Sequence, residues 1–171
     1  MTSKISKKEA LNLIKNSSMF THSIQVGKVM RSIAKRLGED EKEWELVGLL
    51  HDLDYDLTVN NREQHGIIAA KMLKGQLSNV ALAAIKAHDH RTGFRPKKLI
   101  DKALKAADAL VVFIDMTKEE DILLNLKILK QKLNIGLKSR PWLKPLIYSC
   151  KEFGFALEDF LRIGLELEKE I

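Results

Sequence analysis

The sequence VGLLHDLDYD, residues 47–56, joins an apolar segment to a histidine and an aspartate that lie side by side. An imidazole and a carboxylate both lose hydration when they are buried, and apolar neighbours do not replace it. The pair His51 and Asp52 at the end of an apolar run therefore predicts that something else binds both side chains. The remaining question is which other residues in the chain share this role.

Length and composition are those of one soluble domain. The chain has 171 residues, 45% of them hydrophobic and 30% charged, with only three prolines and nine glycines. This length is within the range that a single hydrophobic core serves. The longest apolar run, Ala109–Ile114, is far shorter than the roughly 20 residues of a membrane span. The amino terminus has no apolar segment of the kind found in signal peptides. We therefore expect one domain over residues 1–171, a cytoplasmic location and no membrane partner.

Cysteine usage indicates the redox compartment, and net charge narrows the class of partner. The single cysteine, Cys150, has no partner for an internal disulfide or a CxxC zinc site, which agrees with a reducing compartment. The net charge of +6 favours an anionic partner, although excess lysine also serves to solvate a surface. The positive charge is spread along the chain and lacks an aromatic and basic stacking platform. We therefore do not expect nucleic acid to be the partner.

Helical periodicity and helix caps run through the whole chain. Ser6–Glu9, Asp40–Glu43 and Thr117–Glu120 each place a side-chain acceptor at an N-cap and a glutamate three residues later. Gly38 and Gly75 stand where glycine commonly ends a helix. No segment alternates with a period of two, so no sheet is expected. The sequence predicts an all-α fold, with helices at residues 7–15, 21–37, 41–52, 62–74, 79–89, 97–115, 118–133, 142–152 and 157–169.

One segment interrupts the helical pattern. Residues 134–145, NIGLKSRPWLKP, contain a glycine and two prolines. The segment is too short to separate two independent domains. We therefore expect residues 117–171 to form a C-terminal helical extension that packs on the core.

Most of the histidines lie on apolar helix faces. Residues three, four and seven apart share one face of a helix, which directs six polar side chains inward. These residues are His22, His51, Asp52, His65, His88 and Asp108. His90 follows His88 by two residues, so it turns to the other side and should lie at the surface. A lone inward histidine is usually a core residue, but four of them with two aspartates favour a shared role.

A metal centre accounts for this set of side chains. Neutral imidazoles and ionised carboxylates are the usual nitrogen and oxygen ligands of divalent first-row metals. The charge of the cation also offsets the cost of burying a carboxylate. Adjacent residues on a helix differ by about 100°, so His51 and Asp52 can reach neighbouring positions on one ion.

These residues resemble the HD-domain superfamily of metal-dependent phosphohydrolases, an all-helical fold named for its adjacent His-Asp pair. The resemblance covers residues 18–116, where its pattern of a histidine, an HD pair and a distant aspartate falls on His22, His51-Asp52 and Asp108. The segments THSIQVGKVM, VGLLHDLDYD and KALKAADAL are also similar to the small bacterial and archaeal HD hydrolases called HDIG proteins. The resemblance implies an HD-domain helical bundle as the core and a site for a metal.

The resemblance also implies how many ions are bound. HD proteins with extra histidines between the pair and the last aspartate often hold two metals. By that resemblance His65 and His88 bind a second ion, with Asp52 bridging the two, while the alternative for His65 is a core position. The expected cofactor is one or two divalent metal ions, with iron, manganese, cobalt and magnesium all open.

The chain departs from the HDIG pattern directly after the pair. Where those proteins have glycine and often lysine, this chain has Asp54, Tyr55 and Asp56. Acids repel a phosphate unless they hold a water molecule, so Asp54 and Asp56 join Asp52 as candidate catalytic residues that orient the attacking water. Aspartates also favour turns, which is the alternative for both.

Basic groups for a phosphate must then come from elsewhere. The loop HRTGFRPKK, residues 90–98, and the helix before it supply them. Each can equally be a solvated surface residue. The candidate substrate-binding residues are Lys86, Arg91, Arg95, Lys97 and Lys98.

The leading hypothesis is hydrolysis of a phosphoester or phosphoanhydride in a small, nucleotide-like molecule. The attacking group would be a water that the metal has acidified. One rival is a di-iron oxygenase, whose ligands can be identical on this scaffold. A second rival is a non-catalytic module that keeps the site only to bind a nucleotide. The sequence leaves a homodimer open.

Overall fold

The protein is an all-α structure. The computed structural model describes residues 4–120, 124–135 and 139–167, and within these ranges it has nine α-helices, three short 3-10 helices and no strand beyond an isolated bridge. The predicted fold class is therefore confirmed. The α-helices are α1 (Lys7–Ile14), α2 (Phe20–Leu37), α3 (Glu41–Leu50), α4 (Ile67–Met72), α5 (Asn79–Ala87), α6 (Leu99–Glu120), α7 (Leu126–Ile135), α8 (Leu143–Tyr148) and α9 (Leu157–Glu166). The 3-10 helices are η1 (Arg62–Gln64), η2 (His90–Thr92) and η3 (Ser149–Phe153).

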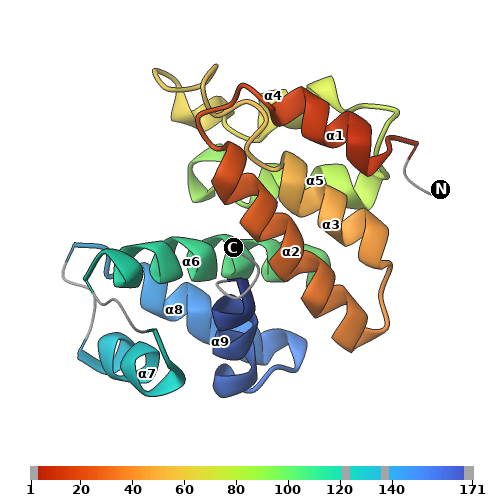
Figure 1. Ribbon diagram of the computed structural model, residues 1–171. Coiled ribbons are helices and arrows are strands. Elements are labelled where there is room, and N and C mark those ends of the chain that lie inside the picture. The colour runs from red at the N-terminus through yellow and green to blue at the C-terminus, as the bar shows by residue number, and fades with distance from the viewer. Residues whose placement is uncertain (1–3, 121–123, 136–138, 168–171) are drawn as a thin grey trace.

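Helix α6 forms the centre of the molecule (Figure 1). It contacts α2 and α5 of the N-terminal part, and α8, η3 and α9 of the C-terminal part. Residues on several sides of it are fully buried, among them Ala103, Leu104, Leu110 and Phe113. A helix that is apolar on so many sides must be covered by other elements. Within the described ranges, no helix has the length and apolar character needed to cross a membrane.

Two of the three predicted helix caps are present. The side chains of Ser6 and Asp40 each accept backbone N–H groups from the first turn of the helix that follows. Gly38 ends α2 in the left-handed conformation, with φ of 71°. The cap predicted at Thr117 is wrong. Its hydroxyl donates to the carbonyl of Phe113 in the preceding turn, so α6 continues past this position.

The helix predicted over residues 62–74 is broken at Gly66. This residue has φ of 77° and separates η1 from α4. A Cβ atom at Gly66 would lie 2.5 Å from the carbonyl oxygen of Ile85, so a larger residue does not fit without movement. The prediction of one continuous helix is therefore wrong. His65, which precedes the break, lies on a loop, and only 3% of it is exposed.

The C-terminal segment packs beneath α6 in Figure 1. The helix predicted over residues 142–152 is divided into α8 and η3, and the one predicted over 118–133 corresponds to the end of α6 and to α7. Parts of these predictions lie outside the described residues. They are positions 121–123 of the helix over 118–133, positions 136–138 of the interrupting segment, and positions 168–169 of the helix over 157–169.

Helices α2 and α3 approach closely at a pair of glycines. A Cβ atom at Gly48 would lie 2.7 Å from both the Cα and the backbone nitrogen of Gly27. Gly48 is one turn before His51, and Gly27 is just over one turn after His22. This contact therefore sets the separation of the two helices that carry these histidines.

Replacing Gly48 by alanine should destabilise the protein. Alanine is a better helix former than glycine by about 1 kcal/mol, but here its methyl group meets backbone atoms, which cannot rotate away. We expect the Gly48→Ala change to lower the free energy of unfolding by about 1–3 kcal/mol, measured by urea denaturation. The exposed Lys42 on the same helix is the control, since Lys42→Ala should change stability by less than about 0.5 kcal/mol. Equal stabilities of the two variants would contradict the close packing.

Candidate metal centre

Five segments bring the inward-facing polar residues into one cluster. They come from the first turn of α2, the end of α3, the loop after η1, the end of α5 and the middle of α6. The cluster consists of His22, His51, Asp52, His65, His88 and Asp108. Two overlapping sets of three, His22 with His51 and Asp108, and His51 with Asp52 and His88, each have ligand atoms within 4.8 Å of one another.

Asp52 lies between two pairs of histidines. Its Oδ2 atom is 3.8 Å from Nε2 of His22 and 3.4 Å from Nε2 of His51. Its Oδ1 atom is 3.0 Å from Nε2 of His65 and 3.5 Å from Nε2 of His88. Each carboxylate oxygen therefore faces its own pair of imidazoles, which is the arrangement of a carboxylate able to bridge two ions.

Backbone carbonyls orient two of these histidines. Nδ1 of His51 donates to the carbonyl of Gly48 at 2.7 Å, and Nδ1 of His88 donates to the carbonyl of Ile85 at 2.6 Å. A carbonyl only accepts, so these contacts place the proton on Nδ1. The Nε2 lone pairs are then directed toward Asp52. Histidines that bind metals are commonly held in this way.

Asp54 holds His65 from the opposite side of the ring. Its Oδ1 atom accepts from Nδ1 of His65 at 2.9 Å, and its Oδ2 atom accepts from the backbone N–H groups of Gly66 and Ala69 at 2.8 and 2.9 Å. Burial acts to raise the pKa of Asp54, but these donors outweigh it and lower the pKa. The carboxylate is 0% exposed. This position does not support the predicted role of Asp54 in orienting water, because its oxygens are already engaged away from the cluster.

Asp56 lies at the surface and is bound to the start of another segment. Its carboxylate accepts from the backbone N–H of Ser18 at 3.0 Å and from the hydroxyl of the same residue. The hydroxyl contact, followed by the backbone contact, lowers the pKa of Asp56. The contacts tie the loop after the HD pair to the residues before α2. They do not support the predicted role of Asp56 in orienting water.

The cluster contains buried acceptors that lack a positive partner. Nε2 of His51 is buried and has no hydrogen bond within the described part of the chain. The Nε2 atoms of His65 and His88 are 3.1 Å apart. Since their Nδ1 atoms carry protons, two lone pairs face each other beside the Asp52 carboxylate and need a proton or a cation between them.

The pKa shifts have the same physical origin. Burial lowers the pKa of His51 to about 4, so its ring is neutral at pH 7. For His65, burial acts in the same direction, but the carboxylates of Asp52 and Asp54 outweigh it and raise the pKa to about 9. Burial would raise the pKa of Asp52, yet the neighbouring histidines hold it well below its usual value. His51 thus offers a neutral imidazole and Asp52 an ionised carboxylate, which are donors that divalent metals use. A cation would take the place of the proton that His65 holds.

Two of the predicted basic residues have partners within their own loop. Nε of Arg91 donates to both carboxylate oxygens of Asp89 at 3.0 Å. The ammonium of Lys86 lies 5.2 Å from the centre of the Phe94 ring. Arg91 is therefore already neutralised, and Lys86 is directed toward an aromatic face.

The other three predicted basic residues lie in the loop before α6. Lys97 and Lys98 have exposed side chains, and their backbone N–H groups donate to Asp101 at 2.8 and 3.0 Å. Arg95 lines a pocket beside α6. Lys105, which the sequence does not predict for the site, lines the same pocket. Its place three residues before Asp108, on a shared helix face, was the available signal.

An all-helical fold surrounds a buried cluster of imidazoles and carboxylates that could hold a metal ion. The model of the HD domain family matches residues 19–130, which is more than half of the chain, so the protein belongs to the HD domain family. Members of this family are in general metal-dependent phosphohydrolases. The match extends beyond the predicted core of residues 18–116 and ends before α8. No curated protein and no solved structure gave a significant match.

The Asp54→Asn change should weaken metal binding. The amide keeps the shape of the side chain, but it loses the charge that orients His65. Loss of such a partner typically costs about 10- to 100-fold in metal affinity, and we expect a decrease of that size when manganese is titrated calorimetrically. The matched control is Asp56→Asn, which removes an exposed carboxylate from the same loop. Equal affinities of the two variants would contradict the role assigned to Asp54.

The metal-free protein should be most stable near pH 6.5. His65 has a raised pKa of about 9, so its contribution to stability is complete below pH 6.5 and is lost as the pH rises through 9. His51 has a lowered pKa of about 4, so the unfolded chain binds more protons and stability falls as the pH drops from 6.5 toward 4. Urea unfolding of EDTA-treated protein across this range measures the effect. A constant free energy of unfolding would contradict it.

Proposed function

We propose that the protein is a metal-dependent phosphohydrolase that acts on a small, nucleotide-like phosphorylated substrate. The observation that carries this proposal is the position of Asp52, whose two oxygens face two separate pairs of histidines. This arrangement fits two divalent ions that share one carboxylate. The usual activity of the HD domain family supports the same reaction class.

The residues divide into two groups around Asp52. His22, His51 and Asp108 would hold one ion together with Oδ2 of Asp52. His65 and His88 would hold the other with Oδ1. Ions at these positions supply a Lewis acid for the phosphoryl oxygens and lower the pKa of a bound water. Iron, manganese, cobalt and magnesium all remain open as the metal.

The hydrogen bonds to the Nδ1 atoms of the histidines hold their Nε2 atoms in place for this chemistry. Gly48, Ile85 and Asp54 each accept the Nδ1 proton of one histidine and so fix the direction of its Nε2 lone pair. Because these partners are in place before a substrate arrives, little reorganisation is needed during the reaction. In this proposal Asp54 is a positioning residue.

The substrate reaches the cluster from the side of Asp108. The side chain of Asp108 is 29% exposed, compared with 11% for His22, 6% for Asp52 and 0% for His51. Lys105 lies on the same side and within electrostatic range of Asp108. An ammonium at this place would offset the negative charge that a phosphoryl group brings toward a carboxylate.

Removing either central carboxylate should abolish metal binding and hydrolysis together. We expect Asp52→Asn and Asp108→Asn to lose bound metal and at least about 100-fold in phosphate release, with helix content unchanged by circular dichroism. Substrates for the screen are phosphomonoesters, cyclic nucleotides and dinucleoside polyphosphates. The control is Asp159→Asn, at an exposed carboxylate on α9 that pairs with Arg36.

Two results would contradict the proposal. One is full hydrolysis by protein from which metal has been removed. The other is an iron-loaded protein that consumes oxygen with an organic substrate and releases no phosphate from any compound in the screen. Tight nucleotide binding without turnover across several metals would also count against it.

A further inference from the structure

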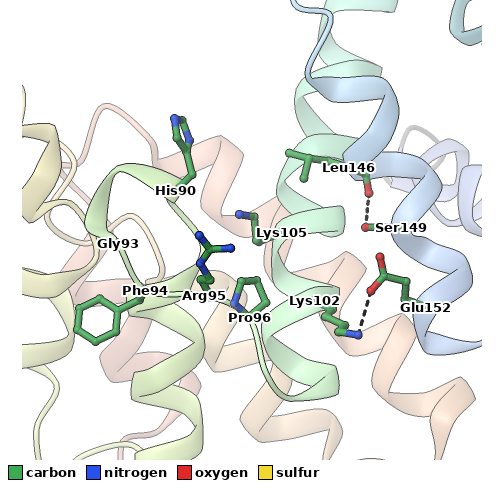
Figure 2. A pocket seen from close by; sticks show the side chains of 10 residues that line it. All are labelled: His90, Gly93, Phe94, Arg95, Pro96, Lys102, Lys105, Leu146, Ser149 and Glu152. Carbon is green, nitrogen blue, oxygen red and sulfur yellow. Dashed lines mark hydrogen bonds and ion pairs between the residues drawn. The ribbon is translucent and has the colours of Figure 1, made fainter.

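A pocket of about 610 Å³ lies beside α6 (Figure 2). Its walls are the loop of residues 93–96, the first half of α6, and the segment formed by α8 and η3. Lys105 lines it and stands one helical turn before Asp108, so the pocket and the more exposed carboxylate of the cluster share one face of α6. A volume of this size is typical of sites that hold a small organic molecule.

Two cations line the pocket without a hydrogen bond or a close ion pair within the described part of the chain. Arg95 and Lys105 both line it, and Figure 2 shows their charged groups directed into the space between the loop and α6. The carboxylates of Asp89 and Asp108 lie within electrostatic range of Lys105, while Arg95 is exposed at the rim. Like charges that face one space repel each other unless an anion lies between them. Burial also lowers the pKa of Lys105, although Asp89 and Asp108 act to raise it.

Elsewhere in the pocket, the charged side chains are paired with each other or the surface is apolar. Nζ of Lys102 lies 2.9 Å from a carboxylate oxygen of Glu152, which joins α6 to η3. Leu146 and Pro96 supply apolar surface. The positive charge that no close ion pair balances therefore comes from Arg95 and Lys105, and the apolar surface of Leu146 and Pro96 suits an organic group.

The C-terminal segment completes this pocket. Leu146, Ser149 and Glu152 lie beyond residue 130, where the match to the HD domain family ends. The wall that they form is therefore a property of this chain's own extension and not of the family domain.

We propose that the pocket binds the part of the substrate that is not cleaved, an organic group carrying its own phosphate, with that phosphate between Arg95 and Lys105. The inference rests on the function proposed for the metal centre and narrows its substrate class. The substrate then has at least two phosphate groups, as in a phosphoanhydride of nucleotide size, because the single phosphate of a simple phosphomonoester would lie at the metal centre and leave Arg95 without an anion. Arg91 takes no part, since Asp89 neutralises it.

Calorimetric titration of the full-length, metal-loaded protein with adenosine 5′-monophosphate tests the inference. We expect the wild type to bind this probe, and Arg95→Gln and Lys105→Gln each to raise its Kd about tenfold, the size of one lost charge-assisted hydrogen bond. The matched control is Lys71→Gln, at an exposed lysine on α4 outside the pocket, which should keep the wild-type Kd. Glu152→Gln should lower the Kd, because it removes a negative charge and frees Lys102.

The outcomes separate this inference from the proposed function. Retained binding of adenosine 5′-monophosphate by the metal-depleted Asp108→Asn protein supports a pocket that is distinct from the metal ligands, even if no compound is hydrolysed. No binding by the wild type, or the same Kd in the Arg95→Gln, Lys105→Gln and Lys71→Gln proteins, would overturn the inference. So would loss of bound metal from Lys105→Gln, since the lysine would then act on the metal centre.

Discussion

The buried carboxylate of Asp52 is the constraint on which the rest of the structure depends. A carboxylate withdrawn from water is costly unless positive or hydrogen-bonding groups surround it. Here four imidazoles do so, two for each oxygen. They must come from four different parts of the chain, because no single helix can present four histidines around one carboxylate. The arrangement of α2, α3, α5 and the loop after η1 around this point meets that requirement.

Several local features serve the same purpose. Close packing at Gly27 and Gly48 sets the distance between α2 and α3, and the break at Gly66 lets His65 approach from a loop. Asp54 then fixes the ring of His65 while also accepting backbone N–H groups at the start of α4. The departure from the HDIG pattern after the HD pair thus has a structural consequence. One of its two acids orients His65, and the other binds the surface loop to the residues before α2.

Helix phase was enough to predict the all-α fold and five of the six inward-facing residues, because burial repeats with the period of a helix, whereas His65 faces inward from a loop. Helix phase did not predict the contact of Asp54 with His65 or the break at Gly66, since both depend on contacts between residues distant in the sequence. A threonine can also cap a helix or bond within one, which explains the wrong boundary at Thr117. The same limit applies to the basic residues. Spacing alone did not distinguish Arg91, which is neutralised by Asp89, from Arg95 and Lys105, which face a pocket.

The central claim is that Asp52 joins two neighbouring ion sites, and anomalous diffraction from crystals of the manganese-loaded protein tests it most directly. The account predicts two manganese peaks in each chain, one on either side of the Asp52 carboxylate. The first should lie among His22, His51 and Asp108, and the second beside His65 and His88. A single peak, or peaks that do not contact Asp52, would contradict the account.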